Sequence, residues 1–158
     1  MAKEVMRSVL FVCLGNICRS PIAEGVFRAR LTAMGLQGQV KVDSAGTSGF
    51  HAGSPPDVRS QRVCKENGIN IGSQRSRKVS RGDFEAFDLV VAMDRTNERD
   101  LLQVSQGDGN LSRLLEFSDT ELTDVPDPYY GGASGFEKVL DLLEDGCASL
   151  LKHIKPKI

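Results

Sequence analysis

The segment from residue 8 to residue 28 constrains the fold most, because a short loop joins an apolar run to an amphipathic pattern within it. The run from Val9 to Val12 is uninterrupted, as is typical of a strand buried on both faces, and Cys13 ends it. Ser20 and Pro21 then predict a helix start, with Ser20 as the N-cap and Pro21 as the first helical residue. The apolar residues that follow at spacings of three and four predict one face of that helix: Ala23, Val26, Phe27, Leu31 and Met34.

A strand, a short loop and a helix in this order form a small bowl of backbone N–H groups at the positive end of the helix dipole. Such a bowl fits a tetrahedral dianion of the size of phosphate. Arg19 adds a planar guanidinium that can hold two anion oxygens, and Gly15 allows turns that a side chain would block. Cys13 is expected at the bottom of the bowl, where the same positive field stabilises a thiolate.

The Cys-x5-Arg spacing alone is also compatible with a buried structural cysteine beside a surface arginine. The strand before it, the Ser-Pro pair after it and the glycine within it favour an anion site. The two histidines of the chain, His51 and His153, are distant from this loop in the sequence. We therefore expect the loop amides, Arg19 and the Ser20 hydroxyl, rather than an imidazole, to activate Cys13.

The loop from Cys13 to Pro21, CLGNICRSP, resembles the signature of the low-molecular-weight protein tyrosine phosphatases. Asp43–Ser48, Met93–Asp94 and Asp127–Gly132 continue the resemblance in matching order over nearly the whole chain. It implies metal-independent hydrolysis of phosphotyrosine and small aryl phosphate monoesters through a phosphocysteine on Cys13, without a cofactor. The phosphate-binding loop would comprise Leu14, Gly15, Asn16, Ile17, Cys18 and Ser20, with Arg19 binding the phosphoryl group.

A thiolate that attacks a phosphate ester expels an alkoxide or phenoxide, so the reaction requires a carboxylic acid on the leaving-group side. Asp127 has an unusual setting, because Pro126 and Pro128 fix the backbone around it and two tyrosines follow. An Asp-Pro turn before the last helix is the alternative interpretation of this segment. The resemblance implies that Asp127 is the general acid and base.

The resemblance also implies supporting residues. Asn16 and Ser44 would brace the loop by hydrogen bonds, and Ser20 can donate to the thiolate. The apolar rim that selects aromatic esters would consist of Leu14, Phe50, Tyr129 and Tyr130. For Phe50, a plug over the core is the alternative. Some relatives carry a histidine near Ser73 that supports the loop, and this chain lacks it, so we expect the bracing to differ in detail.

Cys18 lies in the same loop as Cys13, and two roles are open for it. One is small-residue packing beneath the loop. The other is that of a resolving thiol, which forms a disulfide with oxidised Cys13 and prevents its irreversible oxidation. The four cysteines, which include Cys64 and Cys147, show no Cys-x2-Cys spacing and no neighbouring histidine, which argues against zinc.

The rest of the chain alternates between strand and helix patterns. Strands are predicted at 40–45, 87–93 and 111–117, and helices at 57–67, 97–104 and along the apolar stripe from 136 to 154. This alternation predicts an α/β fold, an open parallel four-stranded sheet with helices on both faces, in a flavodoxin-like three-layer sandwich. Ligands bind beyond the carboxyl ends of such strands, where Cys13 lies.

The basic run from Arg75 to Lys78 is either a solvated loop or a patch for an anion or partner. The length of 158 residues predicts a single domain over 1–158, and the net charge of −1 argues against a nucleic-acid partner. Residues 1–7 are too short and polar for a signal peptide, and no apolar run approaches membrane length. We therefore expect a cytoplasmic monomer without a membrane partner.

The expected partners are a phosphotyrosine-containing protein or a small aryl phosphate, with inorganic phosphate as product and competing ligand. Two alternatives share the Cys-x5-Arg loop. A thiol-dependent arsenate reductase needs two further cysteines near residues 80 to 90, and this chain has none there. A non-catalytic phosphate-binding module has no use for Cys13 together with Asp127.

Overall fold

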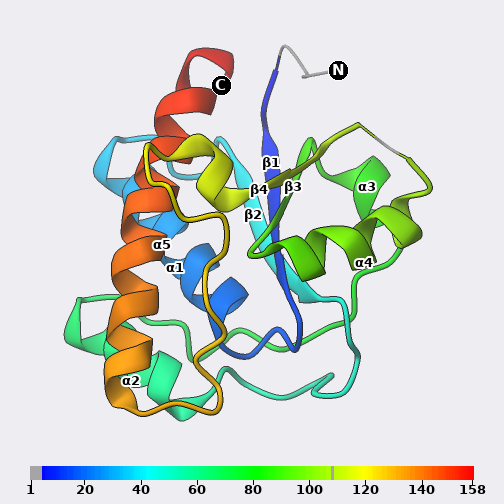
Figure 1. Ribbon diagram of the computed structural model, residues 1–158. Coiled ribbons are helices and arrows are strands. Elements are labelled where there is room, and N and C mark those ends of the chain that lie inside the picture. Colours follow the sequence, from blue (N-terminus) through cyan, green and yellow to red (C-terminus); the bar gives the residue numbers. More distant parts are fainter. Residues whose placement is uncertain (1–4, 108) are drawn as a thin grey trace.

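Four parallel strands form the centre of the fold in the order β2-β1-β3-β4 (Figure 1). Their bounds in this computed structural model are Ser8–Cys13 for β1, Lys41–Gly46 for β2, Leu89–Ala92 for β3 and Leu111–Arg113 for β4. The structure describes residues 5–107 and 109–158. All six residues of β1 are buried, because β1 pairs with strands on both edges and carries helices on both faces.

Five α-helices and two short 3-10 helices are present in the described part of the chain. They are α1 Arg19–Ala33, α2 Val58–Glu66, α3 Asp83–Ala86, α4 Arg95–Ser105, η1 Leu114–Phe117, α5 Ala133–Ile154 and η2 Lys155–Lys157. Helices α1, α2 and α5 lie on one side of the sheet, and α3 and α4 lie on the other (Figure 1). The predicted α/β fold with a four-stranded parallel sheet is therefore confirmed.

The core is divided by the sheet according to the alternation of side chains along β1. Val9 and Phe11 pack with α1 and α5, where the rings of Phe11 and Phe27 make an edge contact at 5.5 Å. Leu10 and Val12 pack on the other face with α3 and α4. The predicted apolar stripe of the last helix is buried along its length, from Phe136 to Ile154.

The predicted start of α1 is wrong. The helix begins at Arg19, and its N-cap is Cys18, which makes no side-chain capping bond. The Ser20 hydroxyl lies inside the first turn and contacts Cys13 and Asn16 instead of a backbone N–H. Met34, predicted on the buried face, is the C-cap and is exposed.

Other boundaries differ where side-chain contacts redirect the chain. The predicted strand 111–117 ends at Arg113, because the Glu116 carboxylate accepts the Arg113 N–H at 3.0 Å and starts a 3-10 turn. Helix α4 begins two residues earlier than predicted, because Asp94 accepts the Asn97 N–H at 2.7 Å. The short helix α3 carries no periodic signal of its own and was not predicted.

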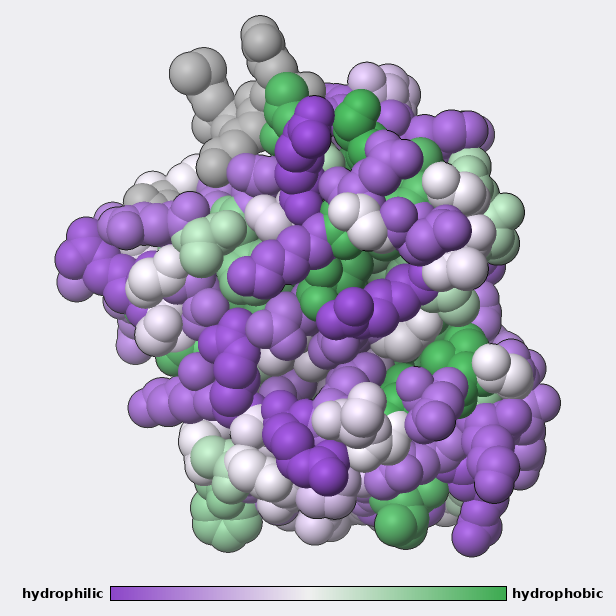
Figure 2. Space-filling model, turned by 180° about the vertical axis from the view of Figure 1, so that it is seen from behind, coloured by the Kyte–Doolittle hydropathy of each residue, from purple (hydrophilic) through white to green (hydrophobic). Residues whose placement is uncertain are grey.

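Polar side chains cover most of the face shown in Figure 2, where apolar groups gather only in small separate areas. Within the described residues, none of the helices combines the length and the apolar character needed to cross a membrane. Residues 1–4, part of the segment judged unlike a signal peptide, lie outside the described residues.

We expect Gly25→Ala to destabilise the protein by about 1 to 3 kcal/mol through overpacking. A β-carbon at Gly25 of α1 would lie 2.5 Å from Ile71 Cγ2 and 3.0 Å from Ile69 Cγ2. Urea denaturation measures the difference.

Gly135→Ala is the matched control, because a β-carbon there meets only Pro128 Cβ, at 3.8 Å, at the start of α5. This variant should be neutral or gain up to about 1 kcal/mol from helix propensity. Equal stabilities for the two variants would contradict close packing at Gly25.

Candidate active site

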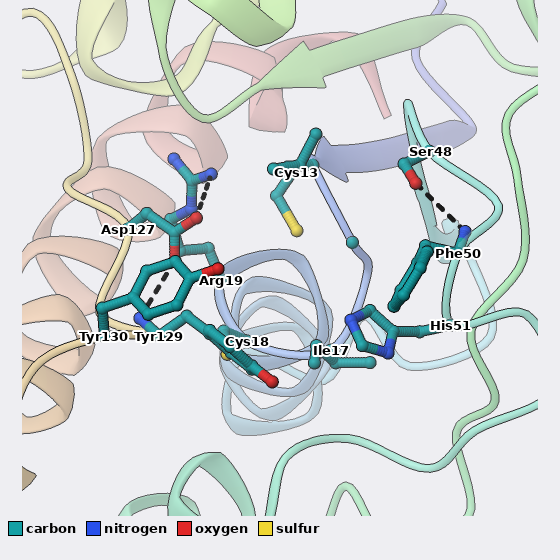
Figure 3. A pocket seen from close by; sticks show the side chains of 12 residues that line it. Cys13, Ile17, Cys18, Arg19, Ser48, Phe50, His51, Asp127, Tyr129 and Tyr130 are labelled. Atoms are coloured by element: carbon teal, nitrogen blue, oxygen red, sulfur yellow. Dashed lines mark hydrogen bonds and ion pairs between the residues drawn. The ribbon is translucent and has the colours of Figure 1, made fainter.

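A pocket of about 300 Å³ opens where β1 ends and α1 begins (Figure 3). Its lining comes from the loop after β1, the loop after β2 and the segment before α5. The lining residues are Cys13, Leu14, Gly15, Ile17, Cys18, Arg19, Ser48, Phe50, His51, Asp127, Tyr129 and Tyr130. The structure therefore brings together the predicted nucleophile, arginine, acid and rim.

The Cys13 sulfur lies at the base of this pocket, and only 2% of the residue is exposed. Its Sγ lies 3.0 Å from the Ser20 Oγ. Two backbone hydrogen bonds hold the residues that begin the loop. The Thr47 N–H donates to the Cys13 carbonyl oxygen at 2.9 Å, and the Ser48 N–H donates to the Leu14 carbonyl oxygen at 2.9 Å. The start of the loop is thus fixed against the chain that leaves β2.

Asn16 organises the loop through all the polar atoms of its side chain. Its Nδ2 donates to Ser20 Oγ at 2.8 Å and to Ser44 Oγ at 3.0 Å, and its Oδ1 accepts the Arg77 N–H at 3.0 Å. Its φ of 56° is the left-handed conformation that asparagine tolerates better than most residues. Because Ser20 accepts from Asn16, its single hydroxyl proton is left for another acceptor, either the Cys13 sulfur at 3.0 Å or the Ala45 carbonyl oxygen at 3.4 Å.

The same network continues from Ser44 to a buried carboxylate. The Ser44 hydroxyl donates to Glu24 Oε1 at 2.8 Å, and Glu24 also accepts from Arg28. Glu24 is 5% exposed, and this burial raises its pKa, although Ser44 and Arg28 partly offset the shift. Gln74, close to the position where some relatives carry a histidine, donates to the Pro21 carbonyl oxygen at 3.1 Å.

Arg19 is a buried cation held by three acceptors. Its Nη1 donates to Asp94 Oδ2 at 2.5 Å and to the Val125 carbonyl oxygen at 2.9 Å, and its Nη2 lies 3.6 Å from Asp127 Oδ2. Burial opposes the charge of Arg19, but the negative charges of Cys13, Asp94 and Asp127 outweigh this effect and raise its pKa. The guanidinium therefore stays charged at the base of the pocket.

Asp94 was not assigned a role from the sequence, although Met93–Asp94 was among the matching stretches. It both binds Arg19 and caps α4. A signal was available, because Asp94 lies just after β3 and Cys13 ends β1, and the carboxyl ends of adjacent parallel strands lie together.

Asp127 lies on the other side of the pocket from the loop after β2 (Figure 3). Its Oδ1 accepts the Tyr129 N–H at 3.0 Å, and its side chain is 41% exposed. The rim residues Phe50 and Tyr130 are 87% and 95% exposed, so their rings form the outer part of the pocket and Phe50 is no core plug.

The basic run after residue 74 serves the loop rather than solvent alone. The Ser76 hydroxyl donates to the Gly15 carbonyl oxygen at 3.0 Å, next to the bond between Arg77 N and Asn16. The Arg77 guanidinium binds Asp43 and Asp83, which fixes this segment between β2 and α3.

Two further pocket residues refine the sequence-based expectations. His51 lines the pocket although it is distant from Cys13 in the sequence, and the sulfur hydrogen-bonds to Ser20 rather than to an imidazole. Cys18 is buried, and burial together with the negative charges of Asp57 and Cys13 raises its pKa to about 12.

The fold and site define an α/β protein in which a buried cysteine and a buried arginine line one pocket, at the end of β1 and the start of α1. Comparison with known proteins identifies the particular family. The model of the family "Low molecular weight phosphotyrosine protein phosphatase" matches residues 8–158, so the chain belongs to this family. It is an enzyme of the phosphoric monoester hydrolase class.

Relatives from bacteria and animals match over nearly their whole lengths. The Bacillus subtilis low molecular weight protein-tyrosine-phosphatase YfkJ is 44% identical over 153 residues, which cover 95% of this chain and 97% of that protein. The human low molecular weight phosphotyrosine protein phosphatase is 42% identical over 156 residues, with coverage of 96% and 98%.

Solved structures agree with this assignment. The crystal structure of YfkJ superposes with a TM-score of 0.90 at 44% identity, covering 95% of each chain. A protein tyrosine phosphatase from Entamoeba histolytica gives a TM-score of 0.90 at 40% identity, covering 94% of this chain and 97% of that chain.

We expect the stability of the wild type relative to Glu24→Gln to fall as the pH rises. The raised pKa of Glu24 means that the folded state binds more protons than the unfolded state above the ordinary carboxyl pKa of 4.5. Ionising the buried Glu24 therefore lowers the free energy of unfolding. This loss is absent well below pH 4.5 and complete once the pH exceeds the raised pKa. Urea denaturation of both proteins between pH 4 and pH 8 measures the trend. A constant or rising difference would contradict it.

Proposed function

We propose that the chain hydrolyses phosphotyrosine and small aryl phosphate monoesters through a phosphocysteine on Cys13. The observation that carries the proposal is the convergence of the Cys13 sulfur, the Arg19 guanidinium and the Asp127 carboxyl group on one pocket. These groups correspond to the three requirements of the reaction, namely a nucleophile, a charge clamp and an acid.

In the first step, the loop amides and Arg19 hold the phosphoryl oxygens while the Cys13 thiolate attacks phosphorus in line with the leaving oxygen. The bond between phosphorus and that oxygen breaks, and Asp127 donates its proton to the departing phenol. The Ser20 hydroxyl donates a hydrogen bond to the sulfur and keeps its proton, an orientation that the bond from Asn16 to Ser20 permits. Preorganised charge should contribute most, because phosphoryl transfer depends mainly on positioning and charge stabilisation.

In the second step, ionised Asp127 accepts a proton from water as the water attacks the phosphocysteine. Inorganic phosphate leaves, the Cys13 thiolate is regenerated, and Asp127 is again protonated. Asp94 positions Arg19 during both steps through the bond at 2.5 Å. Ser44 supports the loop through Asn16.

The pocket wall favours aromatic esters over alkyl ones. Leu14, Phe50, Tyr129 and Tyr130 surround the opening, so a phenyl ring would contact apolar surface on several sides. The substrate is then a phosphotyrosine-containing protein or a small aryl phosphate. The presence of Asp127 beside Cys13, with no cysteine from residue 81 to residue 90, favours this activity over arsenate reduction or silent phosphate binding.

Cys13→Ser should abolish turnover of p-nitrophenyl phosphate while inorganic phosphate still binds, because the loop amides and Arg19 remain. Released nitrophenol measures the first effect, and calorimetric titration with phosphate measures the second. Retained turnover would refute the phosphocysteine route.

Asp127→Ala should lower kcat by about 100-fold or more for phenyl phosphate, in line with the usual contribution of a general acid. The loss should be smaller for p-nitrophenyl phosphate, because nitrophenolate leaves without a proton. Asp124→Ala is the control, since Asp124 pairs with Arg95 and does not line the pocket. Full activity of Asp127→Ala on phenyl phosphate would exclude Asp127 as the acid.

We further propose that Cys18 is the resolving thiol for Cys13. Peroxide oxidises the Cys13 thiolate to a sulfenic acid, the Cys18 sulfur attacks it, and a disulfide forms with release of water. The pKa of about 12 keeps Cys18 protonated at neutral pH, and its proton leaves with the sulfenic hydroxyl group as the water that is released.

Peroxide inactivation should be reversed by added thiol in the wild type and much less in Cys18→Ser, whose Cys13 proceeds to irreversible oxidation. Residual activity on p-nitrophenyl phosphate, before and after dithiothreitol, measures the recovery. Equal recovery in both proteins would leave Cys18 only its packing role.

A further inference from the structure

The imidazole of His51 lies in the wall of the pocket. Its Cδ2 lies 3.1 Å from the position that a β-carbon of Gly15 would occupy, so the ring packs directly on the phosphate-binding loop. Ring contacts to Phe50 at 5.0 Å and Tyr129 at 6.3 Å place it between two rim residues. In Figure 3 the His51 ring lies across the pocket from Asp127 and Arg19, and one of its nitrogens is on the side of the ring that borders the pocket.

The two ring nitrogens of His51 have no hydrogen-bond or ion-pair partner among the described residues. An imidazole carries at least one N–H donor in either protonation state. A donor at the mouth of the pocket, fixed by ring contacts and without a partner in the protein, is available to a substrate.

Lys78 adds an unpaired positive charge to the same side. It is exposed and has no ion pair within the part of the chain that the structure describes, whereas the adjacent Arg77 is bound by Asp43 and Asp83. Its side chain lies along Gly49, where a β-carbon would be 3.5 Å from both Lys78 Cβ and Lys78 Cδ.

The backbone holds Lys78 in this place. A parallel bridge pairs it with Gly46 at the end of β2, and the Val79 N–H donates to the Gly46 carbonyl oxygen at 2.8 Å. Gly49 directly follows Ser48 and precedes Phe50, both of which line the pocket. The Lys78 side chain therefore lies against the loop that carries Ser48, Phe50 and His51.

The opposite edge has a different charge pattern. Asp127 lies there beside two tyrosines and 3.6 Å from the buried Arg19, while Arg59 is bound by Asp57 at 2.9 Å and lies over the Tyr129 ring. A substrate chain that leaves the pocket on this side meets the Asp127 carboxyl group and cations that are already paired, whereas one that leaves on the other side meets unpaired donors.

We propose that His51 and Lys78 bind a carboxylate next to the phosphorylated tyrosine, so that the enzyme prefers phosphotyrosine peptides with acidic flanking residues. The inference rests on the proposed phosphatase activity and names its substrate class. Charge-assisted hydrogen bonds to a carboxylate at a half-exposed edge give moderate selectivity, about threefold to tenfold in kcat/KM.

The test uses matched pairs of phosphotyrosine peptides that carry Asp and Glu, or Asn and Gln, on both sides of the phosphotyrosine. The ratio of kcat/KM within each pair cancels any general effect of a variant on catalysis. The wild-type ratio should be about threefold to tenfold and should fall as salt is added. His51→Gln and Lys78→Gln should each move the ratio towards one.

Lys65→Gln is the control, because Lys65 is an equally exposed lysine of α2 that does not line this pocket and should leave the ratio unchanged. A wild-type ratio of one, or a ratio that both variants retain, would overturn the inference. So would an equal fall in Lys65→Gln, which would indicate only a long-range charge effect. Peptide turnover that persists in Cys13→Ser would instead contradict the proposed function, so the two failures are distinguishable.

Discussion

The buried side-chain amide of Asn16 fixes the direction of hydrogen bonding around the reactive sulfur. Both amide protons are committed, one to Ser20 and one to Ser44, so each hydroxyl must donate elsewhere. Ser44 donates to buried Glu24, and Ser20 is left to donate to Cys13 at 3.0 Å or to the Ala45 carbonyl oxygen at 3.4 Å. The left-handed backbone at Asn16 turns the loop so that these bonds can form at once. The loop is thus supported from behind by a buried hydrogen-bond network that runs from Asn16 through Ser44 to Glu24.

The positive charge of Arg19 is balanced by groups from other segments of the chain. A buried guanidinium without acceptors would be costly, and Arg19 is stabilised by Asp94 after β3 and by a carbonyl group beyond it. Asp94 is itself fixed because it caps α4. Asp94 therefore follows a strand, caps a helix and orients the Arg19 guanidinium. Asp127 lies further from Arg19, at 3.6 Å, and its side chain is 41% exposed.

Elements that are buried on both faces or along one stripe could be predicted from the sequence, because burial leaves a direct pattern of apolar residues. This holds for β1 and for the stripe of α5. The prediction that Ser20 caps the helix was wrong. The capping rule assumes that a serine hydroxyl has only nearby backbone N–H groups to bind, whereas the Ser20 hydroxyl binds the side chains of Asn16 and Cys13. Strand β4 was predicted too long because the side chain of Glu116 turns the backbone, an effect that apolar periodicity does not record.

The sequence by itself determined the local unit in which a cysteine ends a strand and an arginine lies close to the start of the next helix, because strand, loop and helix signals all lie within a few residues. Only the tertiary structure decided which other groups face that unit. His51, Asp94 and Asp127 come from three separate loops that the parallel sheet and its connections bring to one end of β1. Separation along the chain carries no information about such distances, which depend on strand order and on the path of each loop.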